Sequence, residues 1–329
     1  MQYRQLGRSG LAVSLVGLGG NNFGMRIDLA ATRAVVDAAL ECGINFIDSA
    51  ELYGGGESER MLGEVLKGRR QHVVVATKFG RGGMRMPGMP AGPVSPEAHG
   101  SRQYVRHAVE DSLKRLQTDY IDLYYLHFPD PRTPMEETLE ALTELVREGK
   151  VRYIGTCNHS AWQLVEADWI ARTHNLARFI ATQNSYSLLD RGLERDITPA
   201  AVKYGLGIIP FFPLANGLLS GKYQRGAPAP EGSRLAARPG ALTDEQFDKL
   251  DPIEGYARDR GVSLLQVAIG GLAAQPGVAS VISGATRPEQ VKANAAAGEW
   301  LPSQEDREAL DAITKPAPAA APMGGRPAR

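Results

Sequence analysis

Hydrophobic and polar positions follow two alternating patterns along the chain. Short apolar runs such as VVVATKF and IDLYYLH are typical of parallel strands that are covered by helices. The stretches between these runs carry apolar residues at helical spacing, as in Val35, Val36, Ala39 and Leu40. The β-rich runs number eight: Ser14–Gly20, Asn45–Ala50, Val73–Phe79, Ile121–His127, Val151–Asn158, Phe179–Tyr186, Gly207–Pro213 and Ser280–Ala285.

A strand followed by a helix, repeated eight times, predicts an α/β protein with one closed (β/α)8 barrel, the TIM-barrel architecture. Six or seven real strands would instead fit an open, doubly wound sheet. We expect a single domain over residues 1–313. Asp28 before the first helix, Gly43 after it and Gly149 before the fifth strand have the chemistry of helix ends.

Three segments fall outside this repeat. The run YRQLGRSGLAVS alternates around Arg8-Ser9-Gly10 and predicts a β-hairpin that plugs the bottom of the barrel. Two long connections, residues 80–100 and 214–242, have the length of functional loops, and the Gly and Met content of the first suggests an adaptable pocket wall. The Pro/Ala/Gly tail, residues 314–329, is expected to be disordered.

The composition limits the classes of function that this protein can have. The 329 residues are 43% hydrophobic and 22% charged, as in ordinary globular proteins. Lys plus Arg and Asp plus Glu both number 37, which gives no global charge to attract nucleic acid or an anionic membrane. The two cysteines are Cys42 and Cys157, too far apart for a C-x-x-C motif, and the N-terminus lacks a signal-peptide core. We therefore expect a soluble, cytoplasmic protein with a small-molecule partner; the sequence is compatible with a homo-oligomer.

Polar residues at three consecutive strand ends indicate where chemistry takes place. In a parallel barrel the active face lies at the carboxyl ends of the strands. Asp48, Lys78 and His127 fall at the ends of the second, third and fourth predicted strands, and Tyr53 follows Asp48 by five residues. Carbonyl reduction needs a proton donor, and a tyrosine beside an ammonium group is a suitable acid. A single Asp after a strand is more often a helix cap, a single Lys at a strand end a solvated charge, and a single Tyr a packing residue. The prediction therefore depends on all of these residues lying together at adjacent strand ends.

Several cofactor and metal sites are excluded by their missing motifs. A Rossmann G-x-G-x-x-G starting at Gly17 would need glycine at position 22, where the chain has Asn22. The sequence also lacks G-x-x-x-x-G-K-[ST], H-E-x-x-H and any Cys/His cluster with zinc spacing. Neither nucleoside triphosphate hydrolysis nor a metal centre is expected.

The segments GINFIDSAELYGGGESERMLGEVLK, ATKFG, LYYLHFPDPRTPMEETLEALTELVREGKVRYIG and FFPLANGLLSGKY together resemble the aldo-keto reductase superfamily, over about Tyr3 to Thr314. The resemblance implies a barrel that binds NADPH in an extended pose and reduces an aldehyde or ketone. It also implies a catalytic tetrad of Asp48, Tyr53, Lys78 and His127, with Tyr53 as the acid.

The same resemblance implies the cofactor contacts. Asn158 and Gln183 would bind the nicotinamide carboxamide, Phe211 would stack on the nicotinamide ring, and Arg287 would pair with a ribose 2′-phosphate. The implied set is Gly20, Asn21, Arg26, Asp48, Asn158, Gln183, Phe211, Phe212, Pro213, Leu214, Ala215, Gly217, Lys222, Arg234, Gly284, Thr286, Arg287, Gln290 and Asn294.

Two functions fit these residues. The first is a carbonyl reductase. The second is a regulatory, cofactor-binding subunit, because PDPRTPMEETLEAL also resembles the potassium-channel β subunits. That branch typically lacks a histidine at the position of His127, which this chain retains, so the enzyme is favoured. The physiological carbonyl compound is not encoded in any readable motif.

Overall fold

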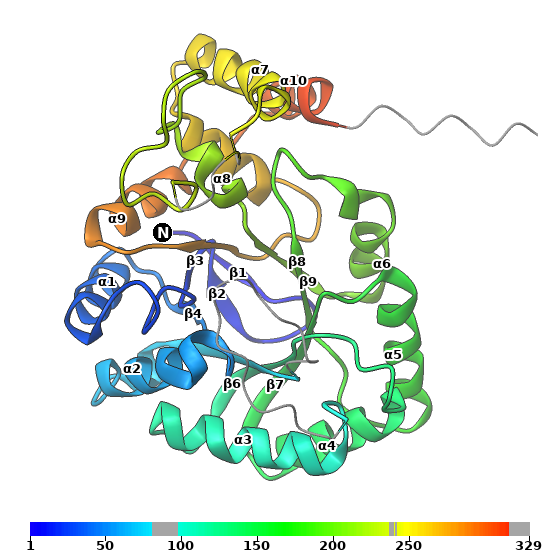
Figure 1. The fold of residues 1–329 in the computed structure, drawn as a ribbon. Helices are drawn as coiled ribbons and strands as arrows, with labels where there is room; N and C mark the ends of the chain where they lie inside the picture. Colours follow the sequence, from blue (N-terminus) through cyan, green and yellow to red (C-terminus); the bar gives the residue numbers. More distant parts are fainter. Residues whose placement is uncertain (81–97, 237–239, 241, 316–329) are drawn as a thin grey trace, which may run out of the picture.

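The structure, a computed structural model, describes residues 1–80, 98–236, 240 and 242–315. Eight parallel strands form one sheet in the order β10-β3-β4-β5-β6-β7-β8-β9 (Figure 1). Their bounds are β3 (Val16–Gly19), β4 (Phe46–Asp48), β5 (Val74–Phe79), β6 (Ile121–Leu126), β7 (Val151–Cys157), β8 (Ala181–Ser185), β9 (Gly207–Phe211) and β10 (Val281–Gly284). Each lies within one of the eight runs predicted from the sequence.

The sheet closes between its first and last strands. Ile208 of β9 bridges Val278, just before β10, through backbone hydrogen bonds from Ile208 N to Gly277 O and from Ala279 N to Ile208 O, of 2.8 and 2.9 Å. The prediction of a (β/α)8 barrel is confirmed, and the open-sheet alternative is wrong.

Helices surround the barrel and bury its outer face. Asp28 starts the first helix because its side chain accepts a hydrogen bond from Ala31 N. Gly43 and Gly149, predicted as helix ends, have φ values of +77° and +76°, which glycine adopts without strain. The helices are α1 (Leu29–Glu41), α2 (Glu57–Val65), α3 (Arg102–Leu116), α4 (Met135–Arg147), α5 (Ala161–Thr173), α6 (Ile197–Tyr204), α7 (Asp244–Arg260), α8 (Leu264–Ala273), α9 (Pro288–Ala297) and α10 (Gln304–Thr314).

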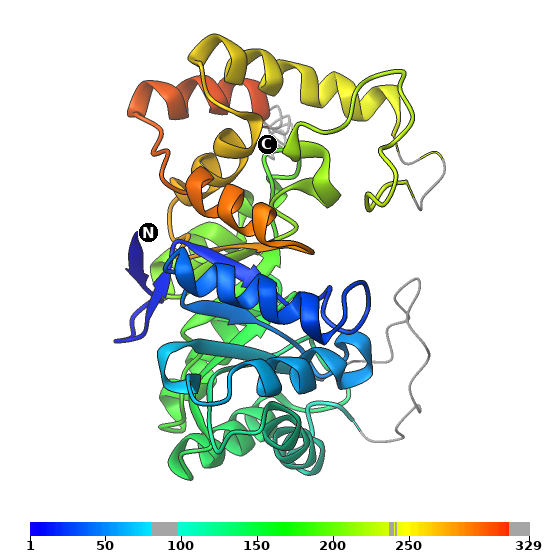
Figure 2. The same cartoon turned by 90° about the vertical axis from the view of Figure 1, so that its left-hand side faces the viewer.

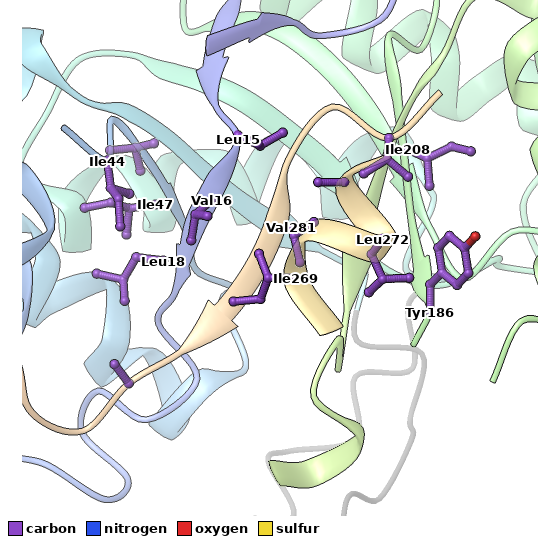
Figure 3. Packing of buried hydrophobic residues seen from close by; sticks show 14 of the residues in the cluster. Leu15, Val16, Leu18, Ile44, Ile47, Tyr186, Ile208, Ile269, Leu272 and Val281 are labelled. Carbon is purple, nitrogen blue, oxygen red and sulfur yellow. The ribbon is translucent and has the colours of Figure 1, made fainter. Parts of the chain in front are cut away.

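The main core lies between the strands and this helical layer. In Figure 3, Ile269 and Leu272 of α8 pack beside Val281 of β10. All three side chains have no solvent exposure. A second cluster, which includes Phe46, Leu123 and Ile209, fills the inside of the barrel. Helices α7 and α10 pack together outside the ring (Figure 1).

An antiparallel hairpin of β1 (Tyr3–Gln5) and β2 (Ala12–Ser14) closes the amino end of the barrel, as the sequence predicted. Leu6 is fully buried in the interior cluster, and Arg8 N donates to Gly205 O at 2.9 Å. Figure 2 shows the hairpin at the opposite end of the barrel from the loop that follows β9. The carboxyl end is therefore the end left for a ligand.

Two sequence predictions lie largely outside the described residues. The pocket wall expected from residues 80–100 falls mostly on residues 81–97. Of the tail expected to be disordered, residues 316–329 lie outside the described residues, whereas Thr314 is the last residue of α10 rather than part of the tail. The assignment of residues 1–313 to one domain also stays a prediction.

Candidate active site

Four polar side chains meet at the carboxyl end of β4, β5 and β6. Asp48 is the last residue of β4, and Lys78 lies one residue before the end of β5. Tyr53 begins the short 3₁₀ helix η1 (Tyr53–Gly56), and His127 follows β6. The backbone hydrogen bond from His127 N to Phe79 O, 2.8 Å, keeps His127 in register with β5. The structure thus brings together the four residues that the sequence indicated.

Lys78 connects three of these groups. Its side chain is fully buried and its Nζ forms an ion pair with Asp48 Oδ2. The same Nζ donates to Ser49 O at 2.7 Å and to Tyr53 OH at 3.3 Å. Gln183 Nε2 donates to the other carboxylate oxygen of Asp48 at 3.0 Å. The ammonium group is therefore held in one place, within reach of the phenol.

Burial and charge set the protonation states here. Burial alone would lower the pKa of Lys78, but the Asp48 carboxylate and the Tyr53 phenol outweigh it and the pKa is raised. The pKa of Tyr53 is also raised, because burial outweighs the opposing effect of Lys78. Lys78 does favour the phenolate, as the sequence analysis expected, yet the net result is a phenol that stays protonated at neutral pH.

His127 is neutral in this environment. Burial, and then the positive charge of Lys78, lower its pKa well below the usual value. The imidazole lies edge-on to Tyr53, with ring centroids 6.2 Å apart, and stacks on Phe128 at 4.4 Å. Within the described part of the chain, its buried Nδ1 has no hydrogen-bonding partner. A buried polar atom without a partner suits contact with a ligand.

The residues expected around the nicotinamide line the next three strand ends. Asn158 follows β7 with a φ of +61°, and its Nδ2 donates to His127 O at 3.0 Å. Gln183 is buried on β8 and touches Asp48 as described. Phe211 ends β9 and meets the exposed Phe212 edge-on, with centroids 5.2 Å apart. Side-chain amides and an aromatic ring at this mouth fit a carboxamide-bearing planar ring.

The loop after β9 has an unusual backbone that suits an anion. Ala215, Asn216 and Gly217 have φ values of +46°, +59° and +99° in the short helix η4 (Ala215–Ser220). Lys222 lies over this turn, because a Cβ on Gly217 would sit 3.1 Å from Lys222 Nζ. The buried Pro213 and the partly buried Leu214 lead into it.

This loop contacts the β3–α1 connection on the other side of the mouth. Arg26 Nη2 donates to Gly232 O at 2.8 Å, and Arg234 Nη2 donates to Asn22 Oδ1 at 3.4 Å. The buried Gly20 precedes this connection, and a Cβ on Gly284 would sit 3.2 Å from Asn21 Oδ1. These contacts place the expected cofactor residues of both loops at one end of the barrel.

The amino end of α9 contributes the remaining expected residues. Gln290 Oε1 accepts from Thr286 N at 2.8 Å and from Thr286 Oγ1 at 3.1 Å. Arg287 precedes Pro288, the first residue of the helix, and is exposed, whereas Asn294 is buried. A helix N-terminus with an exposed arginine suits a phosphate group.

Comparison with known proteins agrees with this arrangement. The model of the Aldo/keto reductase family matches residues 15–315. The chain belongs to the aldo/keto reductase family. Its relatives include a probable voltage-gated potassium channel subunit beta from Oryza sativa, 36% identical over 332 residues that cover 97% of this chain and 98% of that protein. An uncharacterized oxidoreductase, YrpG, from Bacillus subtilis is 36% identical over 306 residues, 89% of each chain.

Membership of the aldo/keto reductase family supports an oxidoreductase acting on a small molecule, in a family that generally uses nicotinamide cofactors. In the described part of this aldo/keto reductase, none of the helices has the length and apolar character needed to cross a membrane. Among the same residues, no group of three or more His, Cys, Asp or Glu side chains is arranged to hold a metal ion.

Three neighbours of the aldo/keto reductase site were missed by the sequence analysis. Ser49 accepts from Lys78 through its carbonyl oxygen, which no side-chain pattern reveals. Cys157 is a free, buried thiol whose Sγ lies 3.2 Å from Asn158 Nδ2, and burial raises its pKa to about 12. Glu51 lies two residues before Tyr53 and bonds to the end of β5. Its place between Asp48 and Tyr53 was the only signal for it in the sequence.

Proposed function

We propose that this protein reduces an aldehyde or ketone to an alcohol with NADPH as the reductant. The observation that carries the proposal is the buried Lys78, whose Nζ contacts both the Asp48 carboxylate and the Tyr53 hydroxyl at the mouth of the barrel. A buried ammonium group beside a protonated phenol is suited to supply a proton to a developing alkoxide.

In the proposed reaction Tyr53 is the general acid. Bound NADPH supplies the hydride, and the Tyr53 hydroxyl gives its proton to the carbonyl oxygen. Lys78 stabilises the phenolate that results, and Asp48 keeps Lys78 charged and in place. His127, neutral because of its lowered pKa, donates a hydrogen bond to the carbonyl oxygen and orients the substrate.

We assign the proposed cofactor contacts to the residues that surround the carboxyl end of the barrel. Asn158 and Gln183 would bind the carboxamide, and Phe211 would cover one face of the nicotinamide ring. The left-handed turn at Ala215–Gly217 with Lys222 would hold the pyrophosphate. Arg287, exposed before α9, would bind the 2′-phosphate and so favour NADPH over NADH.

The test is the Tyr53→Phe variant, which removes the proton and keeps the ring. We expect NADPH binding, followed by fluorescence, to change little, while single-turnover reduction of 4-nitrobenzaldehyde falls by about 10³-fold. Tyr3→Phe is the control, since Tyr3 OH donates to Gly43 O at the far end of the molecule. Near-normal hydride transfer in the Tyr53→Phe variant would show that another group is the acid.

A second function is favoured by the relatives' names. Proteins from Oryza sativa and Arabidopsis thaliana that are 36% identical to this chain are both described as probable voltage-gated potassium channel subunits beta. A cofactor-binding subunit would bind NADPH without turnover across a broad panel of carbonyl compounds. The presence of His127 among the four polar groups supports the enzyme over the binding subunit.

A further inference from the structure

Glu51 lies outside the four polar groups but between two of them in the chain. It belongs to the turn that leads from Asp48 to Tyr53. Its backbone N donates to Lys78 O at 3.1 Å, and its side-chain Oε1 accepts from Gly80 N at 3.0 Å. One residue thus binds the backbone on both sides of Phe79, where β5 ends, and couples this strand end to the Tyr53 turn.

The Glu51 carboxyl group also reaches the helical layer. Tyr104 OH, on the first turn of α3, donates to Glu51 Oε1 at 2.9 Å. The Tyr104 ring stacks on His99 with centroids 4.8 Å apart. The carboxyl group therefore joins the Tyr53 turn, the end of β5 and the start of α3.

This joint matters because the Tyr53–Lys78 contact depends on it. Tyr53 OH lies 3.3 Å from Lys78 Nζ, at the long end of hydrogen-bonding distances, so a small shift of either segment would break it. Asp48 and Ser49 hold the Lys78 side chain, and Ser49 also ties the start of the turn to Ala76 O and to the Ser58 hydroxyl, both at 2.8 Å. Glu51 adds a restraint further along the turn, nearer to Tyr53, and attaches it to the end of β5.

Several charged or titratable groups face Glu51 from the elements packed around it. Tyr104 and Arg115 come from α3, Glu59 from α2 and Tyr124 from β6. Glu59 is itself paired with Arg115 at 2.6 Å and accepts from Thr77 at 2.6 Å. Desolvation, followed by Glu59, raises the pKa of Glu51 to about 7, against the hydrogen bonds and Arg115. The carboxyl group therefore changes its charge near neutral pH.

We propose that Glu51 is a positioning residue that sets the Tyr53–Lys78 contact by holding the Tyr53 turn to the end of β5 and to the start of α3. The inference rests on the proposed reduction and adds a residue to it. The ionised carboxylate accepts both hydrogen bonds at full strength, whereas the protonated form accepts them more weakly. Turnover should therefore rise as Glu51 ionises.

The kinetic test compares Glu51→Gln, Glu51→Leu and Tyr104→Phe with the wild type from pH 5.5 to 8.5. Glu57→Gln is the matched control, because Glu57 is a nearby carboxylate that pairs only with Arg60 among the ion pairs of the described residues. We expect wild-type kcat to rise a few-fold around pH 7, and Glu51→Gln to stay at the low plateau. Glu51→Leu, which removes the acceptor of the hydrogen bonds from Gly80 N and Tyr104 OH, should lower kcat about tenfold with little change in KM for NADPH.

A second test needs no turnover. Because the pKa of Glu51 is higher in the folded state than its ordinary 4.5, the folded state binds more protons between pH 4.5 and 7. Urea unfolding should show that the stability of the wild type, relative to Glu51→Gln, falls with pH across this window and levels off above it. A constant difference across the window would show that the carboxyl group is not buried in this joint.

The outcomes separate the two proposals. If the wild type turns over and the Glu51 and Tyr104 variants match Glu57→Gln in kcat and in pH profile, the positioning role is refuted. If Glu51→Leu does not fold, the Glu51→Gln profile and the Tyr104→Phe kcat decide the question. If no variant, the wild type included, oxidises NADPH with any carbonyl compound, the proposed reduction fails, while the unfolding experiment still reports on the Glu51 joint.

Discussion

The two ends of the barrel each hold a buried aspartate paired with a cation, and the comparison shows what separates a structural cluster from a reactive one. At the amino end Asp122, 2% exposed, pairs with Arg70 and Arg152, both at 2.7 Å, and accepts from Val75 N. Both guanidinium groups also contact the Tyr120 ring, with their central carbons 4.2 and 3.8 Å from its centroid. Both oxygens of Asp122 are thus engaged by the fold itself, although the buried Nε of Arg70 has no partner among the described residues.

At the carboxyl end the aspartate Asp48 is about as buried as Asp122, but its partner Lys78 is fully buried too and the neighbours differ. A protonated phenol touches the ammonium group, and a neutral imidazole beside it has a buried nitrogen without a partner among the described residues. Groups that are not fully satisfied by the protein are free to bind a ligand. Under the proposed function, catalysis and stability would therefore divide between the two ends, as is typical of TIM barrels.

The largest effect should come from breaking the pair at the carboxyl end. Lys78→Met leaves the Asp48 charge buried without its cation, so we expect a loss of about 3 kcal/mol in unfolding free energy. The same variant should lose about 10³-fold in kcat/KM, because the phenolate loses its stabilising charge. Urea unfolding and NADPH consumption measure the two effects, with the exposed Lys67→Met as control. Full activity in Lys78→Met would remove the proposed role of the ammonium group.

The corresponding change at the amino end should affect stability alone. Asp122→Asn removes the charge shared by Arg70 and Arg152, and we expect a loss of about 2 kcal/mol, reduced because Arg152 is 52% exposed. The kcat should stay within about twofold of the wild type, since no proposed site residue contacts this cluster. The exposed Asp119→Asn is the control. A large fall in kcat without unfolding would show that the two ends are coupled.

A smaller effect is expected at the edge of the carboxyl end. Arg287→Ala should weaken NADPH binding about tenfold and NADH binding much less, as expected for loss of a charged hydrogen bond to the 2′-phosphate. Fluorescence titration with both nucleotides measures this. If the binding of both nucleotides were weakened equally, Arg287 would not be the residue that binds the 2′-phosphate.

The smallest effect concerns the pH dependence of His127. Because its pKa is lowered in the folded state, the unfolded chain binds more protons below about pH 6.5, and stability is lost as the pH falls. Relative to His127→Gln, the wild type should lose about 1 kcal/mol between pH 6.5 and 5.5. Unfolding at several pH values measures the difference, and a constant difference would mean that the imidazole is charged in the folded protein.

The sequence predicted the strands, the hairpin and the meeting of four polar residues, because strand period and order determine which residues reach the carboxyl ends. It did not predict how those side chains pair. The Gln183–Asp48 hydrogen bond joins strands four places apart in the sheet, across the mouth of the barrel, and depends on the curvature of the closed sheet.

The joint made by Glu51 was hidden for a related reason. Its partners Gly80 and Tyr104 lie 29 and 53 residues away, on two other elements, so no local spacing connects them. Protonation states were equally unreadable, because the balance between burial and Lys78 at Tyr53 depends on the packed surroundings.

The short bridge between Ile208 and Val278 determines where the closed sheet opens most easily. Two backbone bonds, both at the amino half of the wall, hold β9 to the chain before β10, whereas β10 pairs with β3 at four positions. The backbone amides between β9 and β10 should therefore exchange with deuterium faster than those between β5 and β6. Local opening of the barrel is expected to begin at this junction, on the side that faces α8.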